Sequence, residues 1–282
     1  MKNVPLDKAL AGAVKAARAA GKLMRANWHL PKRVNAVDPH DIKLELDVRC
    51  QKLIGKTLFA AFPQISLLGE EGISGDVNAE YRWVVDPIDG TVNYFFGIPH
   101  AAVSIALQAR SDRWPVAGDK KNARIRTLHP VTRHPSHVTL LGVIYNPFTD
   151  ELWTATRGGP ARLNGKIIRV SRRSRLEEAV VAIGFSKSRK SLEQSLPHLI
   201  RLARRARKIR MLGSAALELA YVASGRLDAY IERSIHLWDI AAGGLILECA
   251  GGKFWVERIV PGKKFRLMAS NGLIHRKLPV PR

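Results

Sequence analysis

Apolar positions recur along the chain with two spacings, and each spacing predicts a different kind of element. Helical spacing is clearest near the N-terminus, where one apolar face is formed by Leu6, Leu10, Ala13, Ala17, Ala20 and Met24. This face predicts a helix over about residues 6–27, and a similar pattern predicts another over 47–62. Short apolar runs bounded by turn residues predict strands at 65–68, 83–86, 102–107, 141–145 and 151–155.

The pattern restarts near residue 176, which indicates a second layered unit. Strands are predicted at 180–183, 208–211 and 228–232, and helices at 192–205, 214–224 and 239–250. Helices that alternate with strands indicate an α/β fold. We expect an N-terminal lobe of residues 1–175 and a C-terminal lobe of residues 176–282, with a cleft between them.

Composition changes this picture mainly through charge. The 282 residues include 46 basic and 24 acidic side chains, a formal net charge of +22. Such an excess attracts polyanions and helps a phosphate-bearing ligand approach, although a need for solubility would explain it equally well. No apolar run reaches 18 residues, so we expect no membrane span and no secretory signal. Cys50 and Cys249 have no metal-type spacing, and we expect reduced thiols in a cytoplasmic protein.

Residues 109–140 form a long polar segment between two runs that could otherwise join as a short hairpin. The segment contains seven Lys or Arg residues and only two acids. Loops of this length are commonly functional or mobile. A tolerated surface insertion is the alternative, because long loops cost little closure entropy.

Carboxylates at the end of one predicted strand are the strongest chemical signal. The run Trp83-Val84-Val85 leads into Asp86-Pro87-Ile88-Asp89-Gly90-Thr91. We expect the strand to end at Asp86, because Pro87 interrupts the hydrogen-bond ladder. Two carboxylates in so tight a turn can bridge a hard cation such as Mg²⁺. Ordinary turn chemistry is the alternative, since Asp, Pro and Gly are common turn residues.

Further acidic residues stand at element ends elsewhere in the chain. Glu70 and Glu71 follow another apolar run. Asp47 and Asp239 each stand at the start of a predicted helix. Helix capping alone would account for both aspartates.

Four motifs in this order and spacing resemble the inositol monophosphatase family, which belongs to the lithium-sensitive, magnesium-dependent phosphomonoesterase superfamily. They are Gly69-Glu70-Glu71, the Asp-Pro-Ile-Asp-Gly-Thr-x-Asn-Tyr run at 86–94, Gly-Ser-Ala-Ala-Leu at 213–217, and Trp-Asp-x-Ala-Ala-Gly at 238–243. The similarity extends to 142–147, 163–165 and 269–272. It implies a layered α-β-α-β-α sandwich and a phosphatase that uses two or three Mg²⁺ ions for a small phosphate monoester.

The resemblance also implies roles for single residues. Glu70, Asp86 and the carbonyl of Ile88 would bind one Mg²⁺, and Asp86, Asp89 and Asp239 a second. A third, weaker ion would use Glu70. Asp47 and Thr91, with Glu70, would orient and deprotonate the attacking water. The N–H groups of Gly90 and Thr91 would add donors to the phosphate.

Substrate contacts are implied at Gly213, Ser214, Ala215 and Glu232, with Asp89 beside them. A carboxylate that accepts from neighbouring hydroxyls suits a polyol phosphate, and inositol monophosphate is the expected substrate. Ser214 as a helix cap and Glu232 as a strand end are the alternatives. His236 could also touch the substrate or be structural. The basic run at 201–210 could instead bind a second phosphate, which would favour fructose 1,6-bisphosphate or 3′-phosphoadenosine 5′-phosphate.

The chain departs from the family pattern before Asp47. Lys43 and Leu44 replace the usual Val and Thr, and the usual upstream lysine falls near Asn35 and Ala36. Lys43 would then either supply the missing cation on the phosphate side or face solvent. The turn at 158–160 is altered as well, which leaves the shape of that loop open.

A second class of function follows from the charge. An RNA- or transcription-associated binding protein on the same fold would use the basic surface and the insertion. A pure binding module gains nothing from clustered carboxylates, which repel phosphate without a metal. Relatives commonly form homodimers, so a homodimer is expected here too.

Overall fold

The computed structural model describes residues 4–38, 41–76, 78–110, 137–184, 189–260 and 264–279. Most of the basic insertion, residues 111–136, lies outside this part of the chain. The described helices are α1 (Leu6–Ala26), α2 (Glu45–Ala61), α3 (Thr91–Phe95), α4 (Arg189–Ala203), α5 (Ala215–Ala223) and α6 (Leu237–Cys249). No helix in these ranges combines the length and apolar character that a membrane crossing needs.

The first sheet has eight strands in the order β10-β9-β8-β7-β6-β5-β3-β4. All neighbours in it pair antiparallel except β3 and β5, which run parallel. Its strands are β3 (Ser66–Gly69), β4 (Gly72–Ser74), β5 (Tyr81–Asp89), β6 (Ala102–Arg110), β7 (His137–Asn146), β8 (Glu151–Thr156), β9 (Arg162–Leu163) and β10 (Lys166–Ile167).

The second sheet has five strands in the order β12-β11-β13-β15-β14. Parallel pairing joins β11 to β12 and to β13. The strands are β11 (Val180–Ile183), β12 (Lys208–Arg210), β13 (Ala229–Ile235), β14 (Lys253–Val260) and β15 (Lys264–Ser270). A separate ribbon of β1 (Val34–Asp38) and β2 (Asp41–Leu44) precedes α2.

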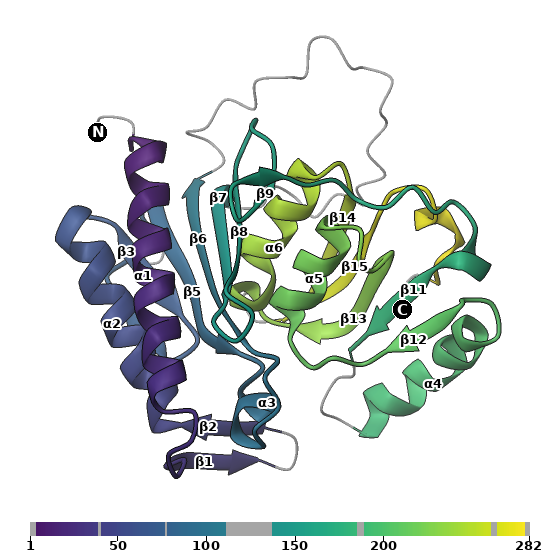
Figure 1. The fold of residues 1–282 in the computed structure, drawn as a ribbon, viewed down its shortest axis with the longest axis horizontal. Helices are drawn as coiled ribbons and strands as arrows, with labels where there is room; N and C mark the ends of the chain where they lie inside the picture. The colour runs from purple at the N-terminus through teal and green to yellow at the C-terminus, as the bar shows by residue number, and fades with distance from the viewer. Residues whose placement is uncertain are drawn as a thin grey trace.

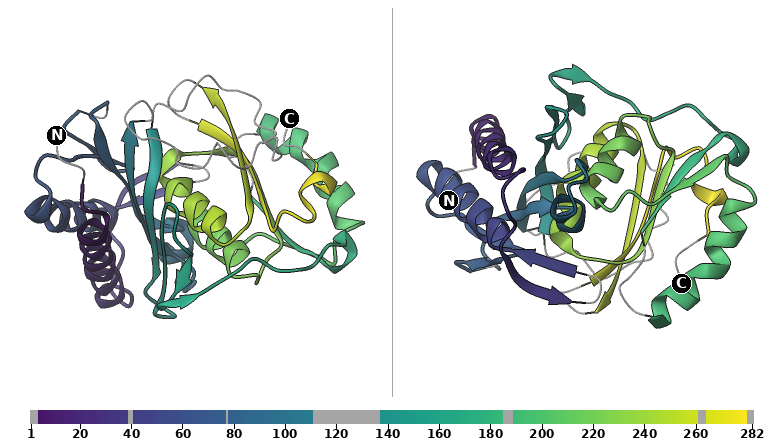
Figure 2. Two further views of the ribbon diagram at one scale, coloured as in Figure 1. Left: turned by 90° about the horizontal axis from the view of Figure 1, so that it is seen from above. Right: turned by 60° about the horizontal axis from the view of Figure 1, so that its bottom comes forward.

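Five layers follow one another across the molecule, as Figures 1 and 2 show. Helices α1 and α2 cover the outer face of the first sheet, α5 and α6 fill the space between the sheets, and α4 covers the far face of the second. The expected α-β-α-β-α sandwich is therefore confirmed. The division into lobes at residue 175 stays a prediction.

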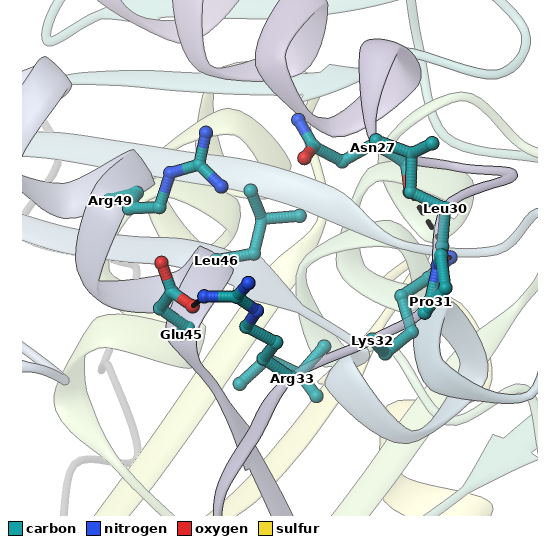
Figure 3. Close-up of a pocket in the computed structure, with 9 residues that line it drawn as sticks. Asn27, Leu30, Pro31, Lys32, Arg33, Glu45, Leu46 and Arg49 are labelled. Atoms are coloured by element: carbon teal, nitrogen blue, oxygen red, sulfur yellow. Dashed lines mark hydrogen bonds and ion pairs between the residues drawn. The ribbon is translucent and has the colours of Figure 1, made fainter.

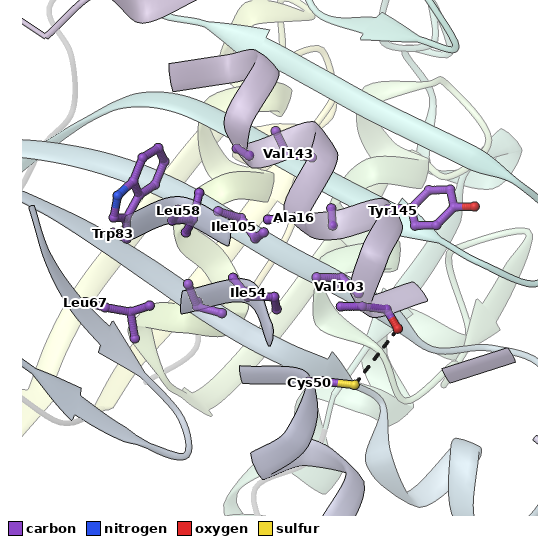
Figure 4. Packing of buried hydrophobic residues seen from close by; sticks show 14 of the residues in the cluster. Ala16, Cys50, Ile54, Leu58, Leu67, Trp83, Val103, Ile105, Val143 and Tyr145 are labelled. Carbon is purple, nitrogen blue, oxygen red and sulfur yellow. Dashed lines mark hydrogen bonds between the residues drawn. The ribbon is translucent and has the colours of Figure 1, made fainter. Parts of the chain in front are cut away.

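Strand alternation explains how each face of the first sheet is filled. Trp83, Val103 and Ile105 point to the α1/α2 side and pack on Ile54 and Leu58, as Figure 4 shows. Val84 and Ala106 point the other way and pack against α5 and α6. Because residues two apart share a face, Asp86 lies on the same side of β5 as Val84. The first acid of the strongest motif is thus turned toward α6.

Helix α6 approaches the first sheet closely because glycine faces it. A Cβ built on Gly142 of β7 would lie 2.7 Å from the Ala242 carbonyl oxygen. Any larger residue there would push α6 away from the sheet. This contact sets the depth at which the start of α6 meets the end of β5.

One expectation about elements was wrong, and the structure adds two features that the sequence did not predict. Strand β5 does not end at Asp86 but continues to Asp89, with a register shift between these residues that accommodates Pro87. Asp47 and Asp239 are not N-caps: each is the third residue of its helix, after Leu44 and His236 in the capping positions. Strands β14 and β15 had no predicted counterpart, because charged residues interrupt their apolar alternation.

Candidate active site

Two neighbouring aspartates of β5 meet a third from a distant part of the sequence between the two sheets. Oxygen atoms of Asp86, Asp89 and Asp239 all lie within 4.8 Å of one another. Asp86 and Asp89 are buried at the end of β5, and Asp239 is partly buried in the first turn of α6. Carboxylates gathered in this way repel one another, so their arrangement needs protons or a cation.

Local backbone contacts aim the first and last of these side chains. The Ile88 N–H donates to Asp86 Oδ1 at 3.1 Å, across the irregular stretch of β5. The His236 N–H donates to Asp239 Oδ2 at 2.8 Å, so Asp239 reaches back over the start of its own helix. The Ser104 hydroxyl on β6 also donates to the Trp238 carbonyl at 3.3 Å, which holds α6 to the sheet.

Asp89 joins the two halves of the chain. Its carboxylate accepts from the Ser214 hydroxyl, from the Ala216 N–H at 2.8 Å and from the Ala215 N–H at 3.3 Å. All these donors stand at the start of α5, where a helix favours negative charge. Ser214 also accepts from the Leu217 N–H at 3.4 Å, so it caps α5 while holding Asp89.

The turn after Asp89 fits only because residue 90 is glycine. Gly90 has φ +90°, and a Cβ there would lie 2.9 Å from the His100 carbonyl and 3.2 Å from that of Gly213. Both the left-handed conformation and the close approach therefore exclude a side chain. This contact brings Thr91 beside the segment that leads into α5.

Glu70 follows the C-terminal end of β3 and lies near the end of β5, because these two neighbouring strands run parallel. Its N–H donates to the Val85 carbonyl at 3.2 Å. Burial raises the pKa of Asp47, Asp86 and Asp239, and the negative charge of Glu70 adds to the rise in each. Gln51 holds the next residue in place, because Gln51 Oε1 accepts from the Glu71 N–H at 2.9 Å.

Asp47 is a buried carboxyl with one oxygen left available. Its Oδ2 accepts from the Leu44 N–H at 2.7 Å, whereas Oδ1 is buried and has no hydrogen-bond partner among the described residues. Burial raises the pKa of Asp47 to about 8, against the lowering effect of the Leu44 N–H, with smaller raising contributions from Glu70 and Glu71. Thr91 is the other residue expected here, and its hydroxyl donates to the Ile88 carbonyl at 2.8 Å.

The donor set fits a hard divalent cation. Burial raises the pKa of Asp86 and Asp239 well above the ordinary aspartate value, and a hydrogen bond joins the two carboxyls. Burial also raises the pKa of Asp89 to about 6, although its donors from α5 oppose this. A divalent ion would replace the shared proton and offset the mutual repulsion, and carboxylate and carbonyl oxygens are the ligands that Mg²⁺ prefers.

The residues expected to contact substrate lie around the start of α5. Gly213 is exposed, whereas Ser214 and Glu232 are buried. Burial raises the pKa of Glu232 to about 7, and its Oε1 accepts from the Arg233 N–H at 3.0 Å. Lys43 is paired with Glu71 at 3.5 Å, and 43% of its side chain is exposed. His236 stacks on Trp238 with ring centroids 4.7 Å apart.

A cavity of about 440 Å³ lies beside α2, away from the three aspartates. Figure 3 shows its walls, which include Leu30, Arg33, Leu46 and Arg49. Arg33 pairs with Glu45 at 3.7 Å there. None of the three clustered aspartates lines this cavity, so the cavity is separate from the aspartate cluster.

Three residues that support the site were not expected from the sequence. Gln51 stands one turn after Asp47 on α2, and this i, i+4 spacing is a signal that could have found it. Asn93 donates to the His100 and Leu212 carbonyls at 2.9 and 2.7 Å. It belongs to the 86–94 motif, which made it findable. Glu218 accepts from the Leu212 N–H at 3.0 Å, and only its charge within an apolar helix marked it.

Known proteins have similar sequences and folds. A profile described as the inositol monophosphatase family matches residues 6–118 and 134–277. The chain belongs to the inositol monophosphatase family. Nus factor SuhB of Xylella fastidiosa is 38% identical over 243 residues, 85% of this chain and 78% of that protein. Inositol-1-monophosphatase of Rhizobium meliloti is 38% identical over 223 residues, 78% and 74% of the two chains.

Solved structures agree. The extragenic suppressor protein suhB from Bartonella henselae superimposes with a TM-score of 0.81 at 33% identity, over 96% of each chain. Membership in this family of phosphomonoesterases confirms the expected enzyme class. The roles of single residues stay predictions.

Proposed function

We propose that the protein is a Mg²⁺-dependent phosphatase that hydrolyses inositol monophosphate. One observation carries this proposal: three aspartates from β5 and α6 meet with their oxygens within 4.8 Å of one another, between the two sheets. A buried carboxylate cluster of this kind weakens a fold unless a cation stabilises it. Function therefore explains the cluster better than stability does.

The metal ligands we propose are oxygen atoms at the C-terminal ends of β3 and β5 and in the first turn of α6. Glu70, Asp86 and the Ile88 carbonyl would hold one ion, and Asp86, Asp89 and Asp239 a second, with a third near Glu70. Bound Mg²⁺ supplies charge neutralisation at the phosphoryl group and polarises its oxygens. The chain's own part is to hold its ligands rigid, as the Asp89 donors from α5 and the Asp86 donor from Ile88 do.

Asp47 is the proposed proton acceptor. The Leu44 N–H fixes one oxygen at 2.7 Å and leaves Oδ1 to take a proton from the attacking water. Burial raises the pKa of Asp47 to about 8 in the metal-free protein, so its ionised form is a strong base, and positive charge bound beside it would favour that form near neutral pH. Thr91 has one hydroxyl proton, now given to the Ile88 carbonyl, and would orient the water through its oxygen.

Substrate recognition is proposed around the start of α5. The Gly90 and Thr91 N–H groups would donate to the phosphate, and Gly213, Ser214, Ala215, Glu232 and Asp89 would contact the polyol. Glu232 has its carboxylate fixed by the Arg233 and Ser234 N–H groups, which suits an acceptor for hydroxyls. Lys43 would add positive charge on the phosphate side. A relative named inositol-1-monophosphatase supports this substrate over fructose 1,6-bisphosphate or 3′-phosphoadenosine 5′-phosphate.

Phosphate release from a substrate panel tests the proposal. Inositol 1-phosphate, fructose 1,6-bisphosphate and 3′-phosphoadenosine 5′-phosphate would each be assayed with Mg²⁺ and with EDTA. We expect turnover of inositol 1-phosphate that needs Mg²⁺. Asp239→Asn should lower kcat/KM by about 100-fold or more, since loss of residues that only support ligands already costs about 10–100-fold. Asp150→Asn, an exposed aspartate paired with Arg18, is the matched control. Equal loss in both variants would refute the metal-site assignment.

A second candidate function is binding of RNA or another polyanion. Five cations at the end of α4 and the start of β12 are exposed and have no carboxylate partner among the described residues: Arg201, Arg204, Arg205, Arg207 and Lys208. Unpaired basic side chains in one short segment attract phosphates. A relative named Nus factor SuhB supports this candidate, which is compatible with catalysis. Binding should weaken steeply as salt is added.

We also propose a cytoplasmic homodimer, from the family resemblance alone. Light scattering on the purified chain tests self-association, and a monomer mass at all concentrations would contradict it.

A further inference from the structure

Glu218 is a buried carboxyl that the catalytic proposal does not use. It lies in α5, its side chain is 2% exposed, and its neighbours Leu217 and Leu219 belong to the core between the sheets. A carboxyl buried among apolar residues is costly unless its oxygens find partners. Burial raises the pKa of Glu218 to about 8, with smaller contributions from Asp89 and Glu232. Hydrophobic packing alone therefore does not explain why a glutamate occupies this position.

The first contact is with the backbone just before α5. Glu218 Oε1 accepts from the Leu212 N–H at 3.0 Å. The Leu212 carbonyl in turn accepts from Asn93 Nδ2 at 2.7 Å. Residue 212 is thus held by its N–H from α5 and by its carbonyl from α3. The next two residues, Gly213 and Ser214, are the ones that face Gly90 and hold Asp89.

The second contact is with Tyr230 on β13. The Tyr230 hydroxyl donates to Glu232 Oε2 at 3.4 Å, and it lies close enough to Glu218 to lower the pKa of that carboxyl, against the larger raising effect of burial. Tyr230 is itself only 2% exposed. The phenol therefore links the two carboxyls inside the protein. Room for this arrangement exists because residue 184 is glycine: a Cβ there would lie within bonding distance of Glu232 Oε2.

Through these contacts Glu218 supports both parts of the proposed polyol site, which are the 213–215 segment and Glu232. One arm fixes the 212–214 segment, and the other reaches Glu232 through Tyr230. We propose that Glu218 is a positioning residue that sets the preference of the site for phosphate esters carrying neighbouring hydroxyl groups. The inference rests on the proposed phosphatase function.

The choice between two substrates tests this role. Inositol 1-phosphate offers hydroxyls to the 213–215 segment and Glu232, whereas p-nitrophenyl phosphate offers none. Glu218→Leu should lower the ratio of their kcat/KM values by about tenfold, which corresponds to about one hydrogen bond's worth of discrimination. The loss should appear mainly as a higher KM for inositol 1-phosphate. Glu218→Gln keeps the acceptor for the Leu212 N–H and should restore the ratio to within about twofold.

A readout that does not depend on activity accompanies the kinetics. Hydrogen exchange in a peptide covering Leu212 should become faster in Glu218→Leu and stay slow in Glu218→Gln, because only leucine removes the acceptor. Tyr230→Phe should change the substrate ratio while leaving this amide protected. The Tyr230→Phe variant also tests the proposal if Glu218→Leu does not fold.

The outcomes separate the inference from the function on which it rests. If the wild-type enzyme hydrolyses neither ester, the proposed function fails, and the exchange data still decide whether Glu218 holds the segment. An equal kinetic loss for both esters would overturn the preference that we assign. Unchanged amide protection in Glu218→Leu would overturn the positioning role itself.

Discussion

At the scale of single residues, the site depends on carboxyls that differ in how they are held. Asp89 accepts three hydrogen bonds from the start of α5, with at least one on each oxygen, whereas Asp47 keeps one oxygen without a partner among the described residues. This difference suits different roles: Asp89 is fixed like a ligand, and Asp47 is free at Oδ1 to accept a proton. Both are buried, yet only Asp47 combines burial with an available atom.

Asp47→Asn should lower kcat by about 100- to 10,000-fold, the usual contribution of a general base. KM should change little, because asparagine keeps the shape of the side chain and the acceptor for the Leu44 N–H. Steady-state kinetics at saturating Mg²⁺ measure the effect. Glu45→Gln, two residues away and paired with Arg33, is the matched control. An Asp47→Asn enzyme that retains a tenth of its activity would refute the proton-acceptor role.

At the scale of elements, α5 contacts and positions several of the proposed site residues, although it is short. Its first N–H groups hold Asp89, its cap Ser214 lies in the proposed polyol site, and Glu218 supports the segment before it. The helix has only nine residues and an almost entirely apolar sequence. Tertiary packing therefore stabilises it more than its intrinsic propensity does.

Glu218 should also make the stability of the metal-free protein depend on pH. Its pKa in the folded protein is about 8, above the ordinary value of 4.5. The folded state then holds a proton that the unfolded state has lost, so this contribution to the free energy of unfolding falls as pH rises from about 4.5 to 8. Urea unfolding in EDTA should show Glu218→Gln gaining stability over wild type, by roughly 3.5 kcal/mol, between pH 5 and pH 8. Other carboxyls titrate in both proteins and largely cancel. A constant difference between the proteins would contradict this prediction.

At the scale of the whole molecule, acidic and basic side chains are unevenly distributed. Three of the 24 acids meet between the sheets, while exposed basic side chains lie on the outer helices. Helices α1 and α4 form opposite outer layers in Figure 1, and both carry exposed cations. Of these two helices, only α4 is followed closely in sequence by the 212–214 segment of the proposed substrate site.

This asymmetry can be tested by removing the same charge from either outer layer. Changing Arg204, Arg205 and Lys208 to Gln should weaken binding of single-stranded RNA by tenfold or more at low salt. The slope of log K against log salt should fall by about 2, since each lost phosphate contact contributes about 0.7. Changing Lys8, Lys15 and Lys22 of α1 to Gln is the control with equal charge. Equal effects in both triples would indicate attraction by net charge alone.

Apolar spacing was enough to predict the alternation of helices and strands, because it distinguishes the two, and the family resemblance implied the layered sandwich. Four motifs in order also located the acidic residues. Predictions failed where a local rule had two solutions. Pro87 can end a strand or lie in an irregular stretch of one. Here β5 pairs with β6 both before and after Pro87, so the strand continues through it. An aspartate near a helix start can cap it or reach back from its third position, as Asp47 and Asp239 do.

What the sequence determined by itself is therefore local: which segments form helices or strands, and which carry chemically useful side chains. The tertiary structure decided which of these side chains meet. Asp89 and Ser214 are 125 positions apart, and only the approach of α5 to the end of β5 makes one the partner of the other. The same holds for the raised pKa of Asp47 and Glu218, because burial is a property of the packed layers and not of any segment alone.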